Sequence, residues 1–179
     1  MTETTPALDL GAVNALPQNE FVAAFGSTFE HSPWVAQGAW KARPFATLDE
    51  LHGAMINVLR IAPRDTQTAF LCGHPELAGK EAEAGTMTTE SVGEQASAGL
   101  DALSRHEVGE LRQLNQSYLD SQGFPFIIAV RRYSKSEIFD QLRSRIERDS
   151  EAELEEALAQ IGTITRLRVQ AKLAASAPS

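Results

Sequence analysis

The chain has 179 residues, the size of one domain with a single buried core. It carries 16 Lys and Arg against 24 Asp and Glu, a formal net charge of −8, and 42% of its residues are hydrophobic. This composition excludes a mainly disordered chain, and an acidic surface repels nucleic acid and anionic membranes. We therefore predict neither nucleic acid nor a membrane as partner, and any anion site must be local.

Cys72 is the only cysteine, so the chain has no intramolecular disulfide and no CxxC metal motif. We expect it to be a small buried residue. The four histidines are widely separated and none forms an HxxxH pair, so no metal site is predicted. No apolar segment of a signal peptide follows Met1, and the longest apolar run, residues 124–130, is too short to span a bilayer. We expect a cytoplasmic protein.

In chain order, residues 1–17 are rich in small residues and contain the helix breakers Pro6 and Pro17, so we expect them to form a flexible N-terminal arm. Residues 174–179 have a similar composition, and we expect a flexible C-terminal tail there. Residues 18–173 predict a single helical domain without a linker. Apolar residues recur there at helical spacing in four stripes: Leu51, Met55, Val58 and Leu59; Val108, Leu111, Leu114 and Tyr118; Ile138, Leu142 and Ile146; and Leu154, Leu158, Ile161 and Ile164. The pattern predicts an all-α bundle of about seven to nine helices.

A Ser or Thr followed three residues later by Glu marks the capping box that begins many helices. The spacing occurs in five pairs: Thr47/Glu50, Ser91/Glu94, Ser104/Glu107, Ser134/Glu137 and Ser150/Glu153. Each pair is predicted to start a helix. The last of these helices is acidic at its start and basic near its end, which suits the helix dipole.

His74 stands between Gly73 and Pro75. Since proline is favoured at the first helical position, Pro75 predicts a helix start with His74 at its N-terminal lip. The helix dipole there disfavours an imidazolium, and a neutral imidazole can donate or accept a proton. The alternative is a histidine that only caps a turn.

Glu94 also has two interpretations. It is the capping partner of Ser91, or it is a carboxylate on the first turn of a helix that faces His74 across a cleft. In the second case it would orient the imidazole or hold a substrate hydroxyl or N–H group.

Arg168 continues the spacing of Ile161 and Ile164, which places it on the apolar stripe of the last helix, whereas Arg166 lies on the charged face. A guanidinium on that stripe has three options: its aliphatic chain extends along the apolar surface so that the charge reaches solvent, it pairs with a carboxylate, or it binds an anion. Arginine geometry suits a bidentate grip on a substrate carboxylate.

The apolar segment 124–128 follows a predicted helix stop at Gly123. Outside a helix, its backbone N–H and C=O groups need partners from the protein or from an amide-rich ligand. The alternative is a buried connector that packs its rings into the core.

Five motifs, in order over about residues 18–172, resemble the family of 2-oxo-4-hydroxy-4-carboxy-5-ureidoimidazoline (OHCU) decarboxylases of urate breakdown. The matching stretches are residues 29–36 with 39–40 and 43–45, residues 73–79, residues 91–95 with 98–100, residues 114–118 with 123–127, and residues 164–169. Val169 is one small departure, because leucine is common there. The resemblance implies an all-α fold and a homodimer.

The resemblance further implies decarboxylation of OHCU to (S)-allantoin without a cofactor, because the substrate's own carbonyl or imine can accept the electrons that carbon dioxide leaves behind. The family's catalytic histidine falls on His74, its glutamate on Glu94 and its arginine on Arg168. The implied substrate contacts are Pro75, Ser91, Glu94, Phe126, Ile127, Ile128 and Arg168.

Two other functions remain open at this stage. One is a non-catalytic helical module that binds a small ureido or amide-rich anion. The other is a related lyase that acts on a different ureido acid.

Overall fold

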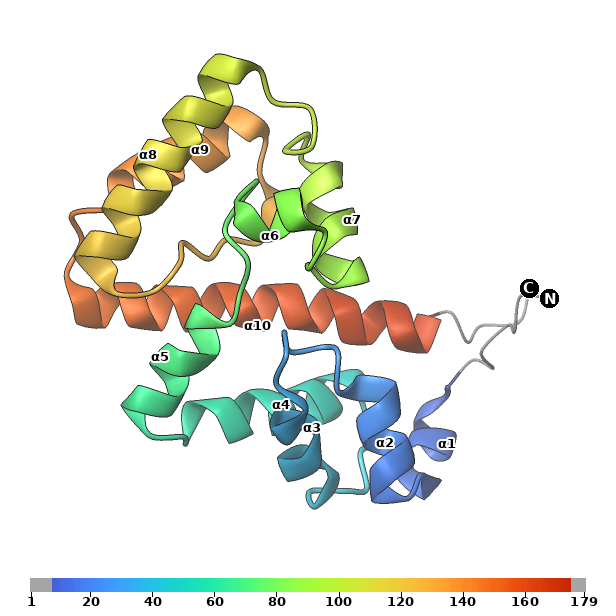
Figure 1. Ribbon diagram of the computed structural model, residues 1–179. Coiled ribbons are helices and arrows are strands. Elements are labelled where there is room, and N and C mark those ends of the chain that lie inside the picture. The colour runs from blue at the N-terminus through green and yellow to red at the C-terminus, as the bar shows by residue number, and fades with distance from the viewer. Residues whose placement is uncertain (1–7, 175–179) are drawn as a thin grey trace. The chain divides into compact units, whose positions relative to one another are not determined.

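The computed structural model describes residues 8–174. Within them the chain forms ten α-helices and one 3₁₀ turn and no strand, which confirms the all-α class (Figure 1). The helices outnumber the seven to nine predicted, since α1 (Leu10–Ala15) has six residues and α6 (Lys80–Ala84) has five. Helices this short have too few residues to show an apolar period.

The chain forms two compact units. Unit 1 comprises Met1–Ala62 and Ile164–Ser179, and unit 2 comprises Pro63–Thr163. Both units are helical, so the helical patterns of the sequence do not mark the boundary between them. The last helix, α10 (Ser150–Ala174), contributes residues to both units.

Unit 1 is built around an aromatic and aliphatic core. Its remaining helices are α1, α2 (Gln18–Phe25), α3 (Pro33–Trp40) and α4 (Leu48–Arg60). Helix α3 packs against both α2 and α4 (Figure 1). The rings of Phe21 and Phe25 are fully buried with centroids 5.0 Å apart, and the predicted stripe buries Leu51, Met55 and Leu59.

Part of the predicted N-terminal arm is ordered helix. Asp9 accepts a hydrogen bond from Ala12 N at 2.7 Å and so caps α1, whose Val13 is fully buried. Asn14 donates to Phe45 O and accepts from Phe45 N, both at 2.8 Å. These partners lie 31 residues apart, so local composition carries no sign of them. Residues 1–7 of the predicted arm and residues 175–179 of the predicted tail lie outside the described residues.

Unit 2 contains α5 (Arg64–Cys72), α6, α7 (Thr89–Ser97), α8 (Arg105–Gln122), the 3₁₀ turn η1 (Val130–Arg132), α9 (Lys135–Arg145) and the first part of α10. Helices α8 and α9 lie side by side (Figure 1). Helix α7 contacts η1. The predicted stripes of α8 and α9 bury Leu111, Tyr118, Ile138 and Leu142.

Three of the five predicted pairs cap their helices as expected. Ser104/Glu107 and Ser134/Glu137 form complete capping boxes, and Thr47 accepts from Glu50 N. Helices α7 and α10 also form at the other two pairs, but the predicted capping residue is wrong there, because a residue earlier in the chain takes the cap. Thr88 accepts from Ser91 N at 3.3 Å, and Asp149 accepts from Glu151 N and Ala152 N at 3.1 Å. Glu94 and Glu153 are thereby released for other contacts.

The capping carboxylate of Glu107 should make stability depend on pH. Hydrogen bonds from Lys135 and from Ser104 lower its pKa to about 2. A depressed folded-state pKa stabilises the fold above the ordinary value and loses that contribution as pH falls. We expect Glu107→Gln to lower the melting temperature at about pH 6, and expect the difference from wild type to shrink steadily between about pH 5 and pH 3. A difference that stays constant over this range would contradict the assignment.

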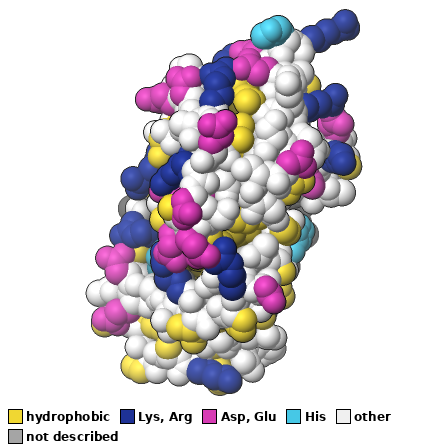
Figure 2. Space-filling model, turned by 90° about the vertical axis from the view of Figure 1, so that its left-hand side faces the viewer, with side chains coloured by type: hydrophobic (Ala, Val, Ile, Leu, Met, Phe, Trp, Pro, Cys, Tyr) yellow, Lys and Arg dark blue, Asp and Glu magenta, His cyan; other side chains and the backbone are white. Residues whose placement is uncertain are grey.

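Charged side chains of both signs are interspersed on the face of the molecule displayed in Figure 2. No helix within residues 8–174 is long and apolar enough to cross a membrane.

Candidate functional site

His74 follows a helix instead of preceding one. Helix α5 ends at Cys72, Gly73 forms its C-cap, and the next helix begins only at Lys80. The N–H of His74 donates to Leu71 O at 3.0 Å, which continues the end of α5. The prediction that Pro75 starts a helix is therefore wrong, and with it the dipole argument for a neutral ring, since a helix C-terminus favours a cation.

The His74 side chain is buried, with 6% of its surface exposed. The ring packs edge-on to Phe70, with centroids 5.0 Å apart, and Nδ1 lies 3.5 Å from Phe70 O. A carbonyl oxygen only accepts hydrogen bonds, so this contact favours the hydrogen on Nδ1. In that tautomer Nε2 carries no hydrogen and is a hydrogen-bond acceptor.

The loop after His74 is held by two buried amides that the sequence patterns did not single out. Gln95 on α7 accepts from Ala78 N at 2.8 Å and donates to Glu76 O at 3.3 Å. Asn115 on α8 donates to Leu77 O at 3.1 Å. Ala78 has a φ of 45°, a left-handed conformation that costs a non-glycine residue energy. The hydrogen bond from Ala78 N helps to hold this strained turn beside α7.

We expect Gln95→Leu to lower the free energy of unfolding by about 1–3 kcal/mol, because it removes the partners of two backbone groups in this loop. Chemical denaturation measures the change. The matched control is Gln116→Leu on α8, where the amide is exposed and bonds only to Asp120 at 2.8 Å; its effect should stay within about 0.5 kcal/mol. Equal effects for the two variants would contradict the role given to Gln95.

Ser91 and Glu94 lie on α7, one turn apart. Ser91 is the third residue of the helix and is buried, whereas Glu94 is half-buried. Because Thr88 provides the cap, Glu94 is no capping partner of Ser91, and that alternative is wrong. Gln95 joins α7 to the loop that carries Pro75, so unit 2 brings the His74 loop and the Glu94 helix together.

The connector between α8 and η1 is buried throughout, including Phe126, Ile127 and Ile128. The ring of Phe126 packs against Tyr118 with centroids 5.2 Å apart, as the buried-connector interpretation expects. Its backbone finds partners as well, since Arg145 donates to Ile127 O at 3.0 Å and Ala129 N donates to Gln160 at 2.9 Å. Within the described part of unit 2, the backbone of Phe126 and of Ile128 makes no hydrogen bond.

Arg168 belongs to unit 1 and is 5% exposed. Its Nη1 donates to Thr28 O and to a carboxylate oxygen of Glu30, both at 3.1 Å. The guanidinium is therefore paired inside the unit and does not reach solvent along its stem. Arg166 lies on the exposed face of α10, as predicted, and pairs with Asp49 at 2.8 Å.

Glu30, the partner of Arg168, is fully buried, and the sequence patterns did not single it out. It stands in the motif of residues 29–36, and nothing local distinguishes it from a surface glutamate. The one available signal was Arg168 itself, because a guanidinium on an apolar stripe requires a carboxylate or an anion beside it.

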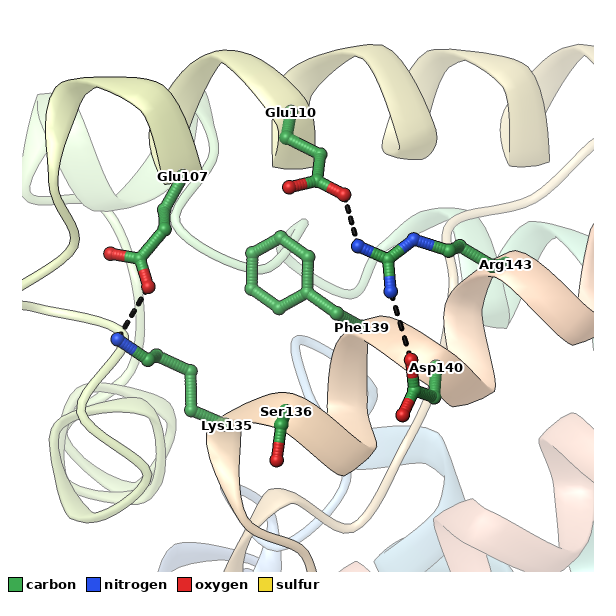
Figure 3. A pocket seen from close by; sticks show the side chains of 7 residues that line it. All are labelled: Glu107, Glu110, Lys135, Ser136, Phe139, Asp140 and Arg143. Carbon is green, nitrogen blue, oxygen red and sulfur yellow. Dashed lines mark hydrogen bonds and ion pairs between the residues drawn. The ribbon is translucent and has the colours of Figure 1, made fainter.

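Unit 2 has at least two hollows whose walls do not include His74, Glu94 or the 126–128 segment. A cavity of about 520 Å³ is bordered by α6, α7 and the start of α8, with Ala78 and Gln95 in its wall. A smaller groove between α8 and α9 holds Lys135 paired with Glu107, and Arg143 paired with Glu110 and Asp140 (Figure 3).

Residues 8–174 contain no cluster of three or more His, Cys, Asp or Glu side chains able to hold a metal ion. Cys72 is exposed at the end of α5, so the expectation of a buried cysteine is wrong.

The OHCU decarboxylase family model matches residues 14–170. The chain belongs to the OHCU decarboxylase family. A 2-oxo-4-hydroxy-4-carboxy-5-ureidoimidazoline decarboxylase of Haloferax volcanii is 41% identical over 162 residues, which cover 90% of this chain and 94% of the relative. The mouse protein of the same name is 36% identical over 172 residues, 96% of this chain and 97% of the relative.

A solved structure, that of an (S)-allantoin synthase, has the same fold as this OHCU decarboxylase family member. The TM-score is 0.74 at 26% identity, and the match covers 93% of this chain and 54% of the other. Membership of the family makes the chain a carboxy-lyase. The convergence of His74 and Glu94 with Arg168 stays a prediction, since Arg168 belongs to the other unit.

Proposed function

We propose that this protein decarboxylates OHCU to (S)-allantoin in urate degradation, without a cofactor. The observation that carries the proposal is the 41% identity to the Haloferax volcanii decarboxylase over nearly the whole length of both chains. The buried imidazole of His74 and the buried, anchored guanidinium of Arg168 support it, because the reaction needs a group that moves a proton and a group that binds an anion.

Arg168 binds the substrate anion in this proposal. Glu30 and Thr28 O fix its Nη1, so the plane of the guanidinium is set before substrate arrives. A pre-set planar fork loses little freedom when it takes a carboxylate through two parallel hydrogen bonds.

Glu94 and His74 hold the hydroxyl and ureido groups, and Pro75 and Ser91 shape the pocket beside them. The backbone of Phe126, Ile127 and Ile128 binds the amides of the substrate. The unbonded backbone groups of Phe126 and Ile128 in unit 2 support this role, since buried N–H and C=O groups need partners.

The reaction breaks the bond between the ring carbon and its carboxylate, and carbon dioxide leaves. The electron pair stays on the ring and is delocalised onto the adjacent carbonyl or imine. His74 Nε2 accepts the proton that the substrate hydroxyl loses and then delivers it to one face of the ring, and delivery to that face sets the S configuration. The homodimer and the cytoplasmic location are further parts of this proposal.

The test uses OHCU generated enzymatically and used at once, with circular dichroism at a wavelength where allantoin absorbs. The expected result is (S)-allantoin formed faster than by spontaneous decay in a sample without the protein. If the protein binds OHCU saturably but does not raise the rate of (S)-allantoin formation, the decarboxylase proposal is wrong and the non-catalytic binding module is favoured. If the protein does not act on OHCU but turns over another ureido acid, the related lyase is favoured.

A further inference from the structure

A buried ionic cluster in unit 2 has no part in the proposed chemistry. Arg145 on α9 is 1% exposed and Glu153 on α10 is fully buried. Arg145 donates from Nε to a Glu153 carboxylate oxygen at 2.7 Å, and Tyr118 donates to the same oxygen at 2.5 Å. Burial, together with Glu153, raises the pKa of the Tyr118 hydroxyl, so it stays protonated and remains a donor.

The same guanidinium also reaches the connector that follows α8. Its Nη1 donates to Ile127 O at 3.0 Å, and its Cζ lies 4.5 Å from the centre of the Phe126 ring. One planar cation thus contacts a carboxylate, a backbone carbonyl and an aromatic face. A lysine ammonium has no fork and no plane with which to make the three contacts together.

The connector depends on such contacts because it lies outside any helix between Gly123 and η1. Another polar contact comes from α10, where Gln160 accepts from Ala129 N at 2.9 Å. Gln160 is itself fixed by donating to Glu156 at 2.8 Å. The carbonyl of Ile127 and the N–H of Ala129 are therefore both held by side chains from elsewhere in the unit.

Stability alone is a weak reason for this arrangement. Taking two charges out of water costs so much that a buried ion pair is often no more stabilising than well-packed apolar residues. The pair does fix the direction of the guanidinium, and the guanidinium fixes the backbone at Ile127. The neighbours of Ile127, namely Phe126 and Ile128, carry the backbone groups assigned above to the substrate.

We infer that Arg145, oriented by Glu153, is a positioning residue that holds the connector in the conformation that binds substrate amides. The inference rests on the proposed function, because it gives the 126–128 backbone a ligand. Arg145 itself makes no contact with the substrate in this inference. It affects substrate binding only through its contacts with Ile127 O and the Phe126 ring.

The decisive variant is the double substitution Arg145→Met with Glu153→Gln, which removes both charges and keeps an acceptor for Tyr118. Arg145→Lys is the second variant, since it keeps the charge and loses the fork. Arg143→Met is the matched control, because Arg143 lies on the same helix and its ion pairs are exposed. For the two Arg145 variants we expect KM for OHCU to rise about tenfold or more and kcat to fall by a smaller factor, as loss of a charge-assisted hydrogen bond would produce. For the control we expect both constants unchanged.

Amide hydrogen exchange of the ligand-free protein reports on the connector without any turnover. We expect faster exchange over residues 124–130 in both Arg145 variants, with residues of α8 protected as in wild type. Faster exchange in a protein that does not act on OHCU would uphold the positioning of the connector and refute the proposed function. Unchanged exchange together with unchanged KM in either folded variant would overturn the inference, as would a loss confined to kcat.

Discussion

Replacing His74 with alanine is expected to lower the rate of (S)-allantoin formation by about 10²–10⁴-fold, the range that a positioned acid or base supplies. The ring is buried and its Nδ1 faces Phe70 O, so one tautomer is favoured and Nε2 is presented for proton transfer. Alanine removes the proton carrier and leaves the loop contacts of Gln95 in place, because these go to Ala78 N and Glu76 O.

The measurement is the initial rate by circular dichroism at saturating OHCU, with the handedness of the product recorded in the same trace. The matched control is His106→Ala, since His106 is exposed in the first turn of α8. Its rate should equal that of wild type. A His74→Ala protein that folds, turns over at nearly full rate and still forms the S product would remove His74 from the mechanism.

Much of the fold follows from patterns that local physics explains. The stripe of Leu51, Met55 and Leu59 is buried as a helical period requires, and the boxes at Ser104 and Ser134 begin α8 and α9. These features depend on residues within one or two turns of each other. Short-range sequence spacing is enough to find them.

The errors arise where two local signals compete. Pro75 suits a helix start, yet the chain continues from α5 through Gly73 and His74 into a loop held by Gln95. Ser91 has the spacing of a cap, yet Thr88 takes that position three residues earlier. At Ser91 a neighbour with equally good capping propensity forms the contact, whereas at Pro75 contacts from α7 hold the chain in a loop. In both cases only the packed structure decides the outcome.

The contacts that matter most for the site join residues far apart in the chain. Glu30 and Arg168 are separated by 138 residues, and Ile127 and Arg145 by 18. No periodicity links such pairs. The position of Arg168 on an apolar stripe therefore predicted that its guanidinium needs a partner, but it did not predict which carboxylate is that partner. Helical spacing singled out Arg168, the resemblance to a family gave it an expected role, and the structure shows its partner.

Glu30→Ala is expected to lower the free energy of unfolding by about 3–5 kcal/mol, because it leaves a buried guanidinium without its carboxylate. Both members of the pair are buried, at 0% exposure for the Glu30 side chain and 4% for that of Arg168. Little solvent is therefore available to compensate for the lost charge. Chemical denaturation of the purified protein measures the change, and Glu30→Gln, which keeps an acceptor, should lose less.

An exposed ion pair that involves the same helix provides the matched control for this prediction. Asp49 pairs with Arg166 two residues before Arg168, but these side chains are 74% and 46% exposed. Asp49→Ala should therefore cost no more than about 1 kcal/mol, as exposed ion pairs do. Similar losses for Glu30→Ala and Asp49→Ala would show that the Arg168 pair is solvated in solution. A solvated guanidinium would have no fixed plane, and the proposed grip on the substrate anion would lose its structural basis.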